Sequence, residues 1–233
     1  MTLEQRIKRN VEEMQTELGD DYWRASAAEL TLVPAIEAAL AEHAEGRLLD
    51  AGAGNLLYRP ILEDHCDAYE SLDVSREAGI DHVQDVQNME LPSDRYDTVF
   101  CRHVLEHVPY PGRAMTELHR VLKPGGVAIV TVPHLAYLHN EPHDYYRFTE
   151  HGVRTLLGEA EFDEVTVEPV GGFCSFAGYS LATLVHGLTY HLPVVSTAAF
   201  AANAALQRAL VAADDLTGNE RYFPFNYLAI ARK

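Results

Sequence analysis

The sequence has 233 residues, of which 47% are hydrophobic and 23% are charged, and its formal net charge at pH 7 is −17. This length suits one well-buried α/β domain, and the balance of residue types excludes a disordered chain, collagen and a coiled coil. An acidic chain repels phosphate backbones, and the sequence contains no basic patch that would offset this. We therefore expect no nucleic-acid partner.

Three cysteines occur, at Cys66, Cys101 and Cys174, and no two of them have CxxC spacing. The odd number and the unpaired spacing argue against a disulfide framework and against a structural zinc site. The N-terminal segment contains no apolar stretch of the signal-peptide kind. We therefore expect a cytoplasmic protein.

Residues 1–45 are predicted to form an N-terminal helical cap. Apolar side chains recur there at helical spacing, at Leu3, Ile7, Val11 and Met14. After a break near Gly19, a second helical stretch is expected from about residue 27 to residue 45. Pro34 marks either the start of this second stretch or a kink in it.

From Arg47 onward, short apolar strands alternate with helical stretches. The first strand begins at Arg47, the second and third end at Asp73 and Asp85, and the others cover about 96–103, 127–133, 164–170 and 226–233. Strands separated by helices predict an α/β fold with a doubly wound, seven-stranded, mostly parallel sheet.

Three local features refine this prediction. Residues 56–65 have a helical pattern, and Lys123–Gly126 is expected to stop a helix and form a turn before the fifth strand. Thr149 is expected to cap a helix that continues to about Leu157.

The stretch 171–225 lies between the last two strands and is far longer than a hairpin loop. From Pro169 to Gln207 it has no Asp, Glu, Lys or Arg, although glycine, proline and histidine interrupt its apolar residues. We interpret it as a helical insertion of two helices. The whole chain, 1–233, is then a single domain made of the cap (1–45), a core (46–170), the insertion (171–225) and a last strand (226–233).

The first strand ends in the segment DAGAGN, residues 50–55. Ligands of doubly wound sheets bind at the carboxyl ends of the strands, and glycines let a ligand approach the backbone closely. An acid directly before the glycines would oppose the pyrophosphate of a nicotinamide dinucleotide. Asp50 instead favours a ligand that carries an ammonium group and a sulfonium.

Two later acids suit the same ligand. Asp73 ends the second strand, where its carboxylate can accept hydrogen bonds from the two hydroxyls of a ribose. Asp85 ends the third strand, where it can accept a hydrogen bond from an exocyclic amine such as that of adenine.

With these residues in view, the sequence resembles the class I S-adenosylmethionine-dependent methyltransferases, in particular their small-molecule "type 11" branch. The resemblance covers about residues 47–170 and 226–233. It rests on five segments in order: LDAGAG (49–54), LD (72–73), QDVQNMELP (84–92), YDTVFCRHVLEHV (96–108) and ELHRVLKPGGVAIVTVP (117–133). Five such segments at family-like separations are far more specific than a lone GxG.

The resemblance implies S-adenosylmethionine as the cofactor and the following residues as its binding site: Asp50, Ala51, Gly52, Gly54, Asp73, Val74, Asp85, Val86, Arg102 and His103. The first four would hold the methionine part, Asp73 the ribose, and Asp85 with Val86 the adenine. Arg102 and His103 would line the methionine side. One position departs from the family pattern, since Leu56 occupies the place of its third glycine.

A shorter resemblance concerns the segment LHNEPHDYYRFTEHG, residues 138–152. It is similar to the segment after the fifth strand in methyltransferases associated with polysaccharide and glycolipid biosynthesis. The acceptor implied is a small molecule or a glycan, which includes lipid-linked ones.

Methyl transfer to a hydroxyl or carboxyl group can use a general base, and histidine suits this role at neutral pH. The candidates are His103, His107, His134, His139 and His143. We rank His143 with Asp144 first, as a histidine oriented by a carboxylate, and keep His107 and His134 as further catalytic candidates. The competing interpretation is that these histidines only support the pocket through hydrogen bonds.

A metal cluster is a further interpretation of this histidine-rich segment. The residues concerned are His134, His139, Glu141, His143 and Asp144. Their spacings are irregular and fall in a loop, so we expect no metal.

Two other features have open interpretations. Tyr22 and Trp23 either close over the cofactor and acceptor as a lid or anchor helix packing. The uncharged part of the insertion, 171–207, either roofs the acceptor pocket, forms a homodimer face or contacts a membrane surface peripherally. A membrane-spanning helix is disfavoured because two histidines and a proline interrupt the apolar run.

Together these observations predict an S-adenosylmethionine-dependent methyltransferase that acts on a small-molecule or glycan acceptor, with oxygen as the expected methyl acceptor. The alternative is a non-catalytic S-adenosylmethionine-binding protein of the same fold that uses the insertion for interactions.

Overall fold

The computed structural model describes residues 2–19 and 25–233. Tyr22 and Trp23 lie outside these residues, so the choice between a lid and a packing anchor stays open. The described chain falls into two compact units. One comprises Met1–Pro34 and Val170–Phe225, and the other comprises Ala35–Pro169 and Asn226–Lys233. The single-domain boundaries expected from the sequence stay a prediction.

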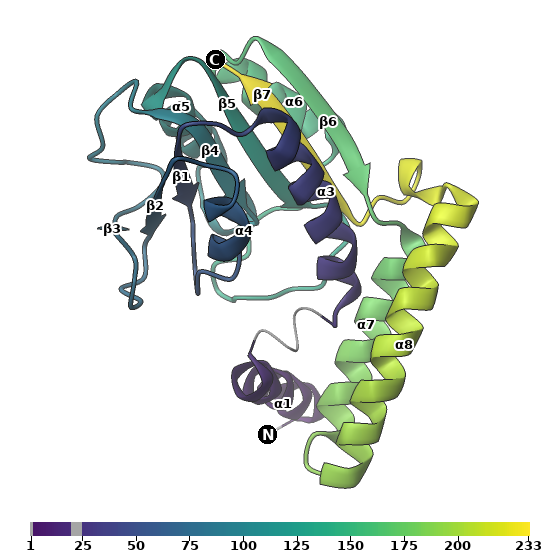
Figure 1. The fold of residues 1–233 in the computed structure, drawn as a ribbon. Helices are drawn as coiled ribbons and strands as arrows, with labels where there is room; N and C mark the ends of the chain where they lie inside the picture. The colour runs from purple at the N-terminus through teal and green to yellow at the C-terminus, as the bar shows by residue number, and fades with distance from the viewer. Residues whose placement is uncertain (1, 20–24) are drawn as a thin grey trace. The chain divides into compact units, whose positions relative to one another are not determined.

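The larger unit contains a seven-stranded sheet in the order β3-β2-β1-β4-β5-β7-β6 (Figure 1). The strands are β1 (Arg47–Ala51), β2 (Ala68–Asp73), β3 (His82–Val83), β4 (Tyr96–Arg102), β5 (Leu122–Pro133), β6 (Glu164–Val170) and β7 (Asn226–Arg232). β1, β2, β3, β4 and β5 pair in parallel, and β7 pairs antiparallel with β5. The predicted α/β fold with a mostly parallel sheet is confirmed.

The order of the strands reverses between β1 and β4. From β1 the chain proceeds to β2 and β3 on one side, and it then returns to β4 and β5 on the other side. The connections on the two sides diverge at this point, which leaves a crevice beyond the carboxyl ends of β1 and β4.

The central strands are buried on both faces. Leu48, Leu49 and Ala51 of β1 are fully buried, and so is the run from Val127 to Pro133 in β5. Continuous apolar runs of this kind are typical of parallel strands that are covered on both faces. They hold the ends of β1 and β4 in fixed positions.

Helices flank these strands in the positions that the sequence pattern indicates. They are α3 (Ala27–His43), α4 (Arg59–Glu63), α5 (Pro111–Val121) and α6 (Glu150–Glu159), and a 3₁₀ turn, η1 (Leu105–His107), follows β4. α5 buries Ala114, Met115, Leu118 and Val121 along one face. The side chain of Thr149 accepts a hydrogen bond from the Gly152 N–H at 3.1 Å, so the predicted cap of α6 is confirmed.

Two local predictions are wrong in their boundaries. The helix expected over 56–65 covers only Arg59–Glu63, because Leu56 has a positive φ of 62° and Pro60 belongs in a first helical turn. The turn expected at Lys123–Gly126 lies within β5, where Gly125 has a positive φ of 82° and the pairing with β4 shifts register. There Lys123 Nζ lies 2.7 and 2.8 Å from the two Asp97 carboxylate oxygens.

The smaller unit contains the two helices predicted in the insertion, α7 (Phe173–Thr189) and α8 (Pro193–Thr217). They lie side by side as a pair, and α1 (Leu3–Leu18) packs against α7 (Figure 1). The side chain of Asn10 donates to the Gly187 carbonyl at 2.8 Å. A side chain at position 187 would meet Ile7, so glycine permits this close approach.

The carboxylate of Asp214 joins α8 to the beginning of α7. It accepts hydrogen bonds from the backbone N–H groups of Gly172, Cys174 and Ser175 at 2.8–3.0 Å, and from the Asn219 side chain at 2.7 Å. These N–H groups have no partner within a helix, and the positive end of the helix dipole favours the charge. Burial by itself raises the pKa of Asp214, but the hydrogen bonds from Ser175 and Asn219 lower it below its usual value.

We predict that Asp214→Ala destabilises the smaller unit by about 2 kcal/mol, because it leaves buried N–H groups without acceptors. Chemical denaturation and hydrogen exchange of the α7 amides measure this loss. The matched control is Asp215→Ala, which removes the same charge from an exposed neighbouring position. Equal stability losses in the two variants would contradict the capping role.

Candidate functional site

A cavity of about 690 Å³ opens at the carboxyl ends of β1, β2 and β4. This volume falls within the usual range for sites that bind small ligands. It is lined by the turns after β1, β2 and β3, by η1 and by part of the segment 134–148. All of its lining residues belong to the larger unit.

The turn after β1 is shaped by its glycines. Gly52 has a φ of 92°, and its N–H donates to the Leu72 carbonyl at 2.7 Å. A side chain at position 52 would collide with Val104, so the position requires glycine. Gly54 has a φ of 51°, and a Cβ there would meet no atom of the described chain within 4 Å. A ligand can therefore approach the backbone at Gly54.

Leu56, which stands in place of the family's third glycine, adopts a left-handed conformation with a φ of 62°. Glycine adopts this conformation freely, whereas leucine pays roughly 1–2 kcal/mol. The turn therefore keeps a glycine-like path at this position despite the substitution.

Asp50 is the penultimate residue of β1 and lines the cavity. Its side chain is 3% exposed, and Tyr69 donates a hydrogen bond to it at 2.9 Å. Burial raises the pKa of Asp50 to about 7, although the Tyr69 hydroxyl and the nearby Arg102 act in the opposite direction. A cationic ligand beside it would favour the charged form.

Asp73 and Asp85 both line the cavity. The Asp73 carboxylate accepts the Gly54 N–H at 2.9 Å and both the N–H and the hydroxyl of Ser75 at 2.7–2.8 Å, so it joins the first two turns. Asp85 accepts the backbone N–H of Gln87 at 2.8 Å, and both of its oxygens lie 3.1 Å from the Gln87 side-chain nitrogen. A carboxylate has about four acceptor positions, which leaves capacity for a ligand hydroxyl or amine at each.

The remaining predicted cofactor residues divide into two groups. Val74, Val86, Arg102 and His103 line the cavity together with Gly52 and Gly54, whereas Ala51 is fully buried and does not line it. Arg102 lies over the Tyr58 ring at 4.7 Å from its centroid. Burial, with Arg102 close by, lowers the pKa of His103 well below its usual value, so this imidazole is neutral at pH 7.

The cavity is also lined by His107, Asn140, His143 and Tyr145. Nδ1 of His143 lies 3.1 Å from the Tyr145 hydroxyl. Nδ1 of His107 donates to the His143 carbonyl at 2.6 Å, which joins η1 to the segment after β5. Two predicted catalytic candidates, His143 and His107, are therefore brought together here.

The predicted pairing of His143 with Asp144 is wrong in its geometry. Asp144 forms a two-pronged ion pair with Arg147 at 2.6 and 2.9 Å and accepts the His139 N–H. Burial opposes ionisation, but these partners lower the pKa of Asp144 to about 2. A guanidinium offers two parallel donors and outcompetes a single imidazole.

His134 also lies apart from the cavity lining. Its Nδ1 is 2.7 Å from the Phe148 carbonyl, and its ring meets Tyr227 edge-on. The structure thus gives His134 a hydrogen bond that fixes the segment after β5, and its catalytic role stays a prediction.

Several residues at the site carry no sequence signal of their own. Tyr69 and Tyr58 are ordinary strand and turn residues in the pattern, and Glu106 is part of the LEH segment. Glu106 is nevertheless fully buried, and burial raises its pKa to about 8 against the opposing effect of its own N–H and of Arg102. The contact of Tyr69 with Asp50, the contact of Tyr58 with Arg102 and the burial of Glu106 follow only from the three-dimensional arrangement.

Comparison with known proteins bears directly on this arrangement. A family profile described as "Methyltransferase domain" matches residues 22–186. The chain belongs to this methyltransferase family. A curated relative from Cereibacter sphaeroides, "Phosphatidylethanolamine N-methyltransferase", is 31% identical over 107 residues, which cover 39% of this chain and 52% of the relative. The chain spans no more than about half the length of the curated relatives it matches.

Solved structures share the fold at low identity. A methyltransferase from Thermotoga maritima, titled a "possible histamine N-methyltransferase", has a TM-score of 0.58 and 16% identity and covers 98% of this chain and 99% of its own. Phosphoethanolamine N-methyltransferase 2 of Haemonchus contortus in complex with S-adenosyl-L-methionine has a TM-score of 0.53 and 18% identity. The match covers 82% of this chain and 49% of that structure's chain. The predicted class I methyltransferase fold is confirmed, whereas the polysaccharide branch stays a prediction.

The residues of this methyltransferase fit S-adenosylmethionine. The cavity is large enough, a buried carboxylate lies where a cation would stabilise its charge, and Gly54 leaves the backbone open to a ligand. Family membership together with the cofactor-bound neighbour supports S-adenosylmethionine as the cofactor. The residue-by-residue assignment of the binding site stays a prediction.

We predict that cofactor affinity increases about tenfold for each unit by which the pH is raised toward about 7, and that it is constant above that pH. The reason is that a cationic ligand binds the ionised form of Asp50. The sign follows from the raised pKa: the carboxyl is protonated in the free protein at low pH and must lose its proton on binding. Calorimetry with the demethylated cofactor in two buffers of different ionisation enthalpy counts the released proton.

Asp50→Asn is the control for this measurement. It keeps the shape of the side chain, weakens binding and removes the contribution of Asp50 to proton release. Titration of the ligand's own amine persists in both proteins. Identical pH profiles for the two proteins would exclude Asp50 as the group that titrates.

Proposed function

We propose that this methyltransferase transfers a methyl group from S-adenosylmethionine to an oxygen atom of a small-molecule or glycan acceptor. The observation that carries the proposal is that one cavity is lined by both sets of residues. The glycine turn and the acids predicted to hold the cofactor line it, and so do the polar rings of His107, His143 and Tyr145.

The cofactor, when bound, supplies an electrophilic methyl group on a sulfonium. In the proposal Asp50 faces the cationic part of the ligand, Asp73 the ribose and Asp85 with Val86 the adenine. Positioning is the main contribution of the chain, since displacement at a sulfonium methyl already has a good leaving group.

His143 is the residue we propose to accept the proton of the acceptor hydroxyl. Its side chain is exposed to the cavity, and the Tyr145 hydroxyl lies beside its Nδ1 at 3.1 Å. If Nδ1 carries the ring proton and donates it to Tyr145, Nε2 has the lone pair that a base requires. Tyr145 is then a positioning residue that fixes the tautomer.

We expect labelled methyl from S-adenosylmethionine to appear on oxygen in a panel of sugars, phenols and carboxylic acids. His143→Ala should lower kcat by roughly 100-fold or more without changing affinity for the demethylated cofactor. His151→Ala removes an exposed histidine outside the cavity lining and should leave kcat unchanged. Cofactor binding without turnover on any acceptor would favour the non-catalytic alternative.

A second candidate function is methyl transfer to the nitrogen of a phospholipid headgroup. The similarity to phosphatidylethanolamine N-methyltransferase favours it. The acceptor panel therefore includes phosphoethanolamine and phosphatidylethanolamine vesicles. Label on nitrogen, with no label on oxygen, would replace the first proposal by the second.

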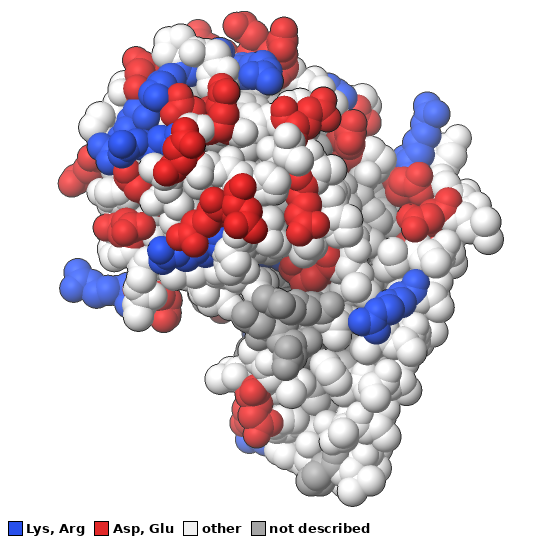
Figure 2. Space-filling model, in the orientation of Figure 1, with Lys and Arg blue, Asp and Glu red and all other residues white. Residues whose placement is uncertain are grey.

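The insertion supports contact with a lipid surface. Leu181, Leu184 and Leu188 recur along one face of α7 and are 46–52% exposed, and Val194 at the start of α8 is 84% exposed. Figure 2 shows that the surface over α7 and α8 carries few charged side chains on the face in view. α8 also has the length and composition of a membrane span over Val194–Thr217, with 6% of its most apolar window buried.

We infer that the α7 face lies on a phospholipid bilayer, with its apolar side chains in the interfacial region. Flotation with vesicles should recover the protein in the lipid fraction. Replacing Leu181, Leu184 and Leu188 by Gln should abolish recovery, because the apolar stripe is lost. The control variant Val83→Gln with Leu138→Gln removes exposed apolar side chains from the other unit. It should still be recovered in the lipid fraction. Recovery of the wild-type protein in the aqueous fraction would overturn this inference. Sedimentation would then test whether the same apolar face of α7 forms a homodimer.

A further inference from the structure

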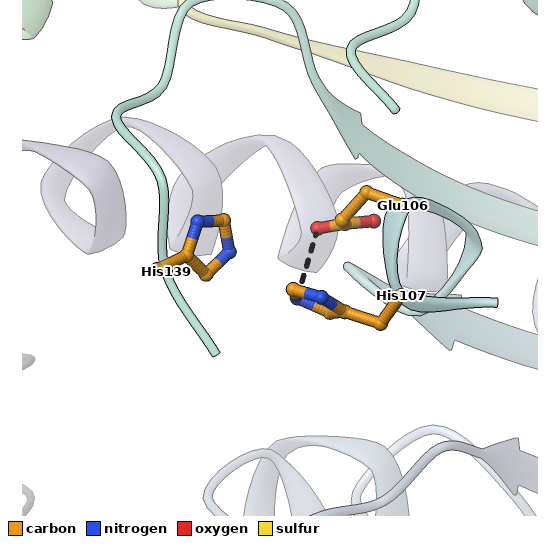
Figure 3. A group of neighbouring side chains, drawn as sticks. All are labelled: Glu106, His107 and His139. Atoms are coloured by element: carbon orange, nitrogen blue, oxygen red, sulfur yellow. Dashed lines mark ion pairs between the residues drawn. The ribbon is translucent and has the colours of Figure 1, made fainter. Parts of the chain in front are cut away.

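A buried carboxylate and two imidazoles converge beside the cavity. Glu106 and His107 belong to η1, and His139 belongs to the segment that follows β5. One potential ligand atom from each residue can be chosen so that all three lie within 4.8 Å of one another. Figure 3 shows the three side chains facing one another from two segments of the chain.

The carboxylate of Glu106 lacks the partners that a buried charge needs. Its side chain is fully buried, and neither oxygen has a hydrogen-bond partner among the residues that the structure describes. Its Oε1 lies 3.8 Å from Nε2 of His107 and 3.9 Å from Nδ1 of His103, beyond hydrogen-bond distance. A buried carboxylate left without partners is costly, and a bound cation would remove that cost.

Both histidines are held in the tautomer that metal-binding histidines use. Nδ1 of His107 lies 2.6 Å from the His143 carbonyl, and Nδ1 of His139 lies 3.0 Å from the Tyr137 carbonyl. A carbonyl only accepts, so each Nδ1 carries the proton and each Nε2 has a lone pair. Backbone carbonyls orient metal-binding imidazoles in the same way.

We propose that Glu106, His107 and His139 bind one divalent transition-metal ion of the zinc class. Ligand atoms of a tetrahedral zinc ion lie roughly 3.4 Å apart, so the 3.8 Å between Glu106 and His107 needs a small contraction, and the separations of up to 4.8 Å within the cluster require a larger side-chain movement. Two imidazoles and one carboxylate leave at least one coordination position open. Mg²⁺ and Ca²⁺ are disfavoured because they prefer oxygen ligands.

The open position has a consequence that rests on the proposed function. His107 lines the cavity, and its Nε2 accepts a long hydrogen bond of 3.5 Å from the Asn140 side-chain amide, which a metal ion at Nε2 would displace. An acceptor oxygen that entered the cavity beside His107 would reach the ion, which would lower the pKa of the hydroxyl and fix its direction. The metal site itself does not depend on this role.

Zinc titration of the EDTA-treated full-length protein against a chromophoric chelator tests the site without cofactor or acceptor. We expect one equivalent of Zn²⁺ to bind. Glu106→Gln and His139→Ala should each weaken binding by roughly 100-fold, because each removes one ligand. His151→Ala, an exposed histidine outside the cluster, controls for adventitious binding and should bind as tightly as the wild type.

A second measurement separates loss of a ligand from loss of the fold. Zn²⁺ should raise the Tm of the wild type and of His151→Ala but not that of Glu106→Gln, and Co²⁺ should give visible absorption bands only in the first two. Absence of saturable binding in the wild type, or an equal loss in His151→Ala, would overturn the metal site. Because neither readout involves methyl transfer, that failure would leave the proposed function untouched.

Discussion

Burial of the Asp50 carboxylate at the end of β1 is the constraint on which the cavity depends. β1 lies between β2 and β4, and its apolar neighbours Leu48, Leu49 and Ala51 are fully buried, so the strand cannot turn this side chain toward solvent. Ionising such a group is unfavourable until a positive charge lies beside it. The turn that follows leaves room for such a ligand, because Gly52 passes close to Val104 and Gly54 leaves the backbone accessible.

The strands and their ends could be predicted because buried parallel strands leave a strong local signal. Buried apolar runs mark β1, β4 and β5, and Thr149 marks the start of α6, whereas β3 ends at Val83, two residues before the acid expected to end it. The short helix α4 and the early start of β5 could not be predicted in the same way. They depend on the backbone conformation of Leu56 and on the pairing of Lys123 with Asp97.

Side-chain partners among the polar residues of η1 and the segment after β5 could be predicted least. Neighbours in sequence suggested that His143 and Asp144 form a pair, but Arg147 binds the carboxylate and Tyr145 contacts the imidazole. The burial of Glu106 has no local signal either. It arises because the segment after β5 folds over η1, where the Tyr145 N–H donates to the Glu106 carbonyl at 2.8 Å. The contacts between η1 and the segment after β5 join residues more than thirty positions apart, so no local pattern in the sequence predicts them.

The first and last residues of the α7–α8 insertion are joined by a backbone hydrogen bond. The Phe225 N–H donates to the Gly171 carbonyl at 2.9 Å, so the chain leaves the helical pair where it entered. β6 and β7 are neighbours in the sheet on the other side of this closure. The helical pair therefore leaves the sheet and returns to it at one point, so its length between Gly171 and Phe225 is not tied to the pairing of β6 with β7.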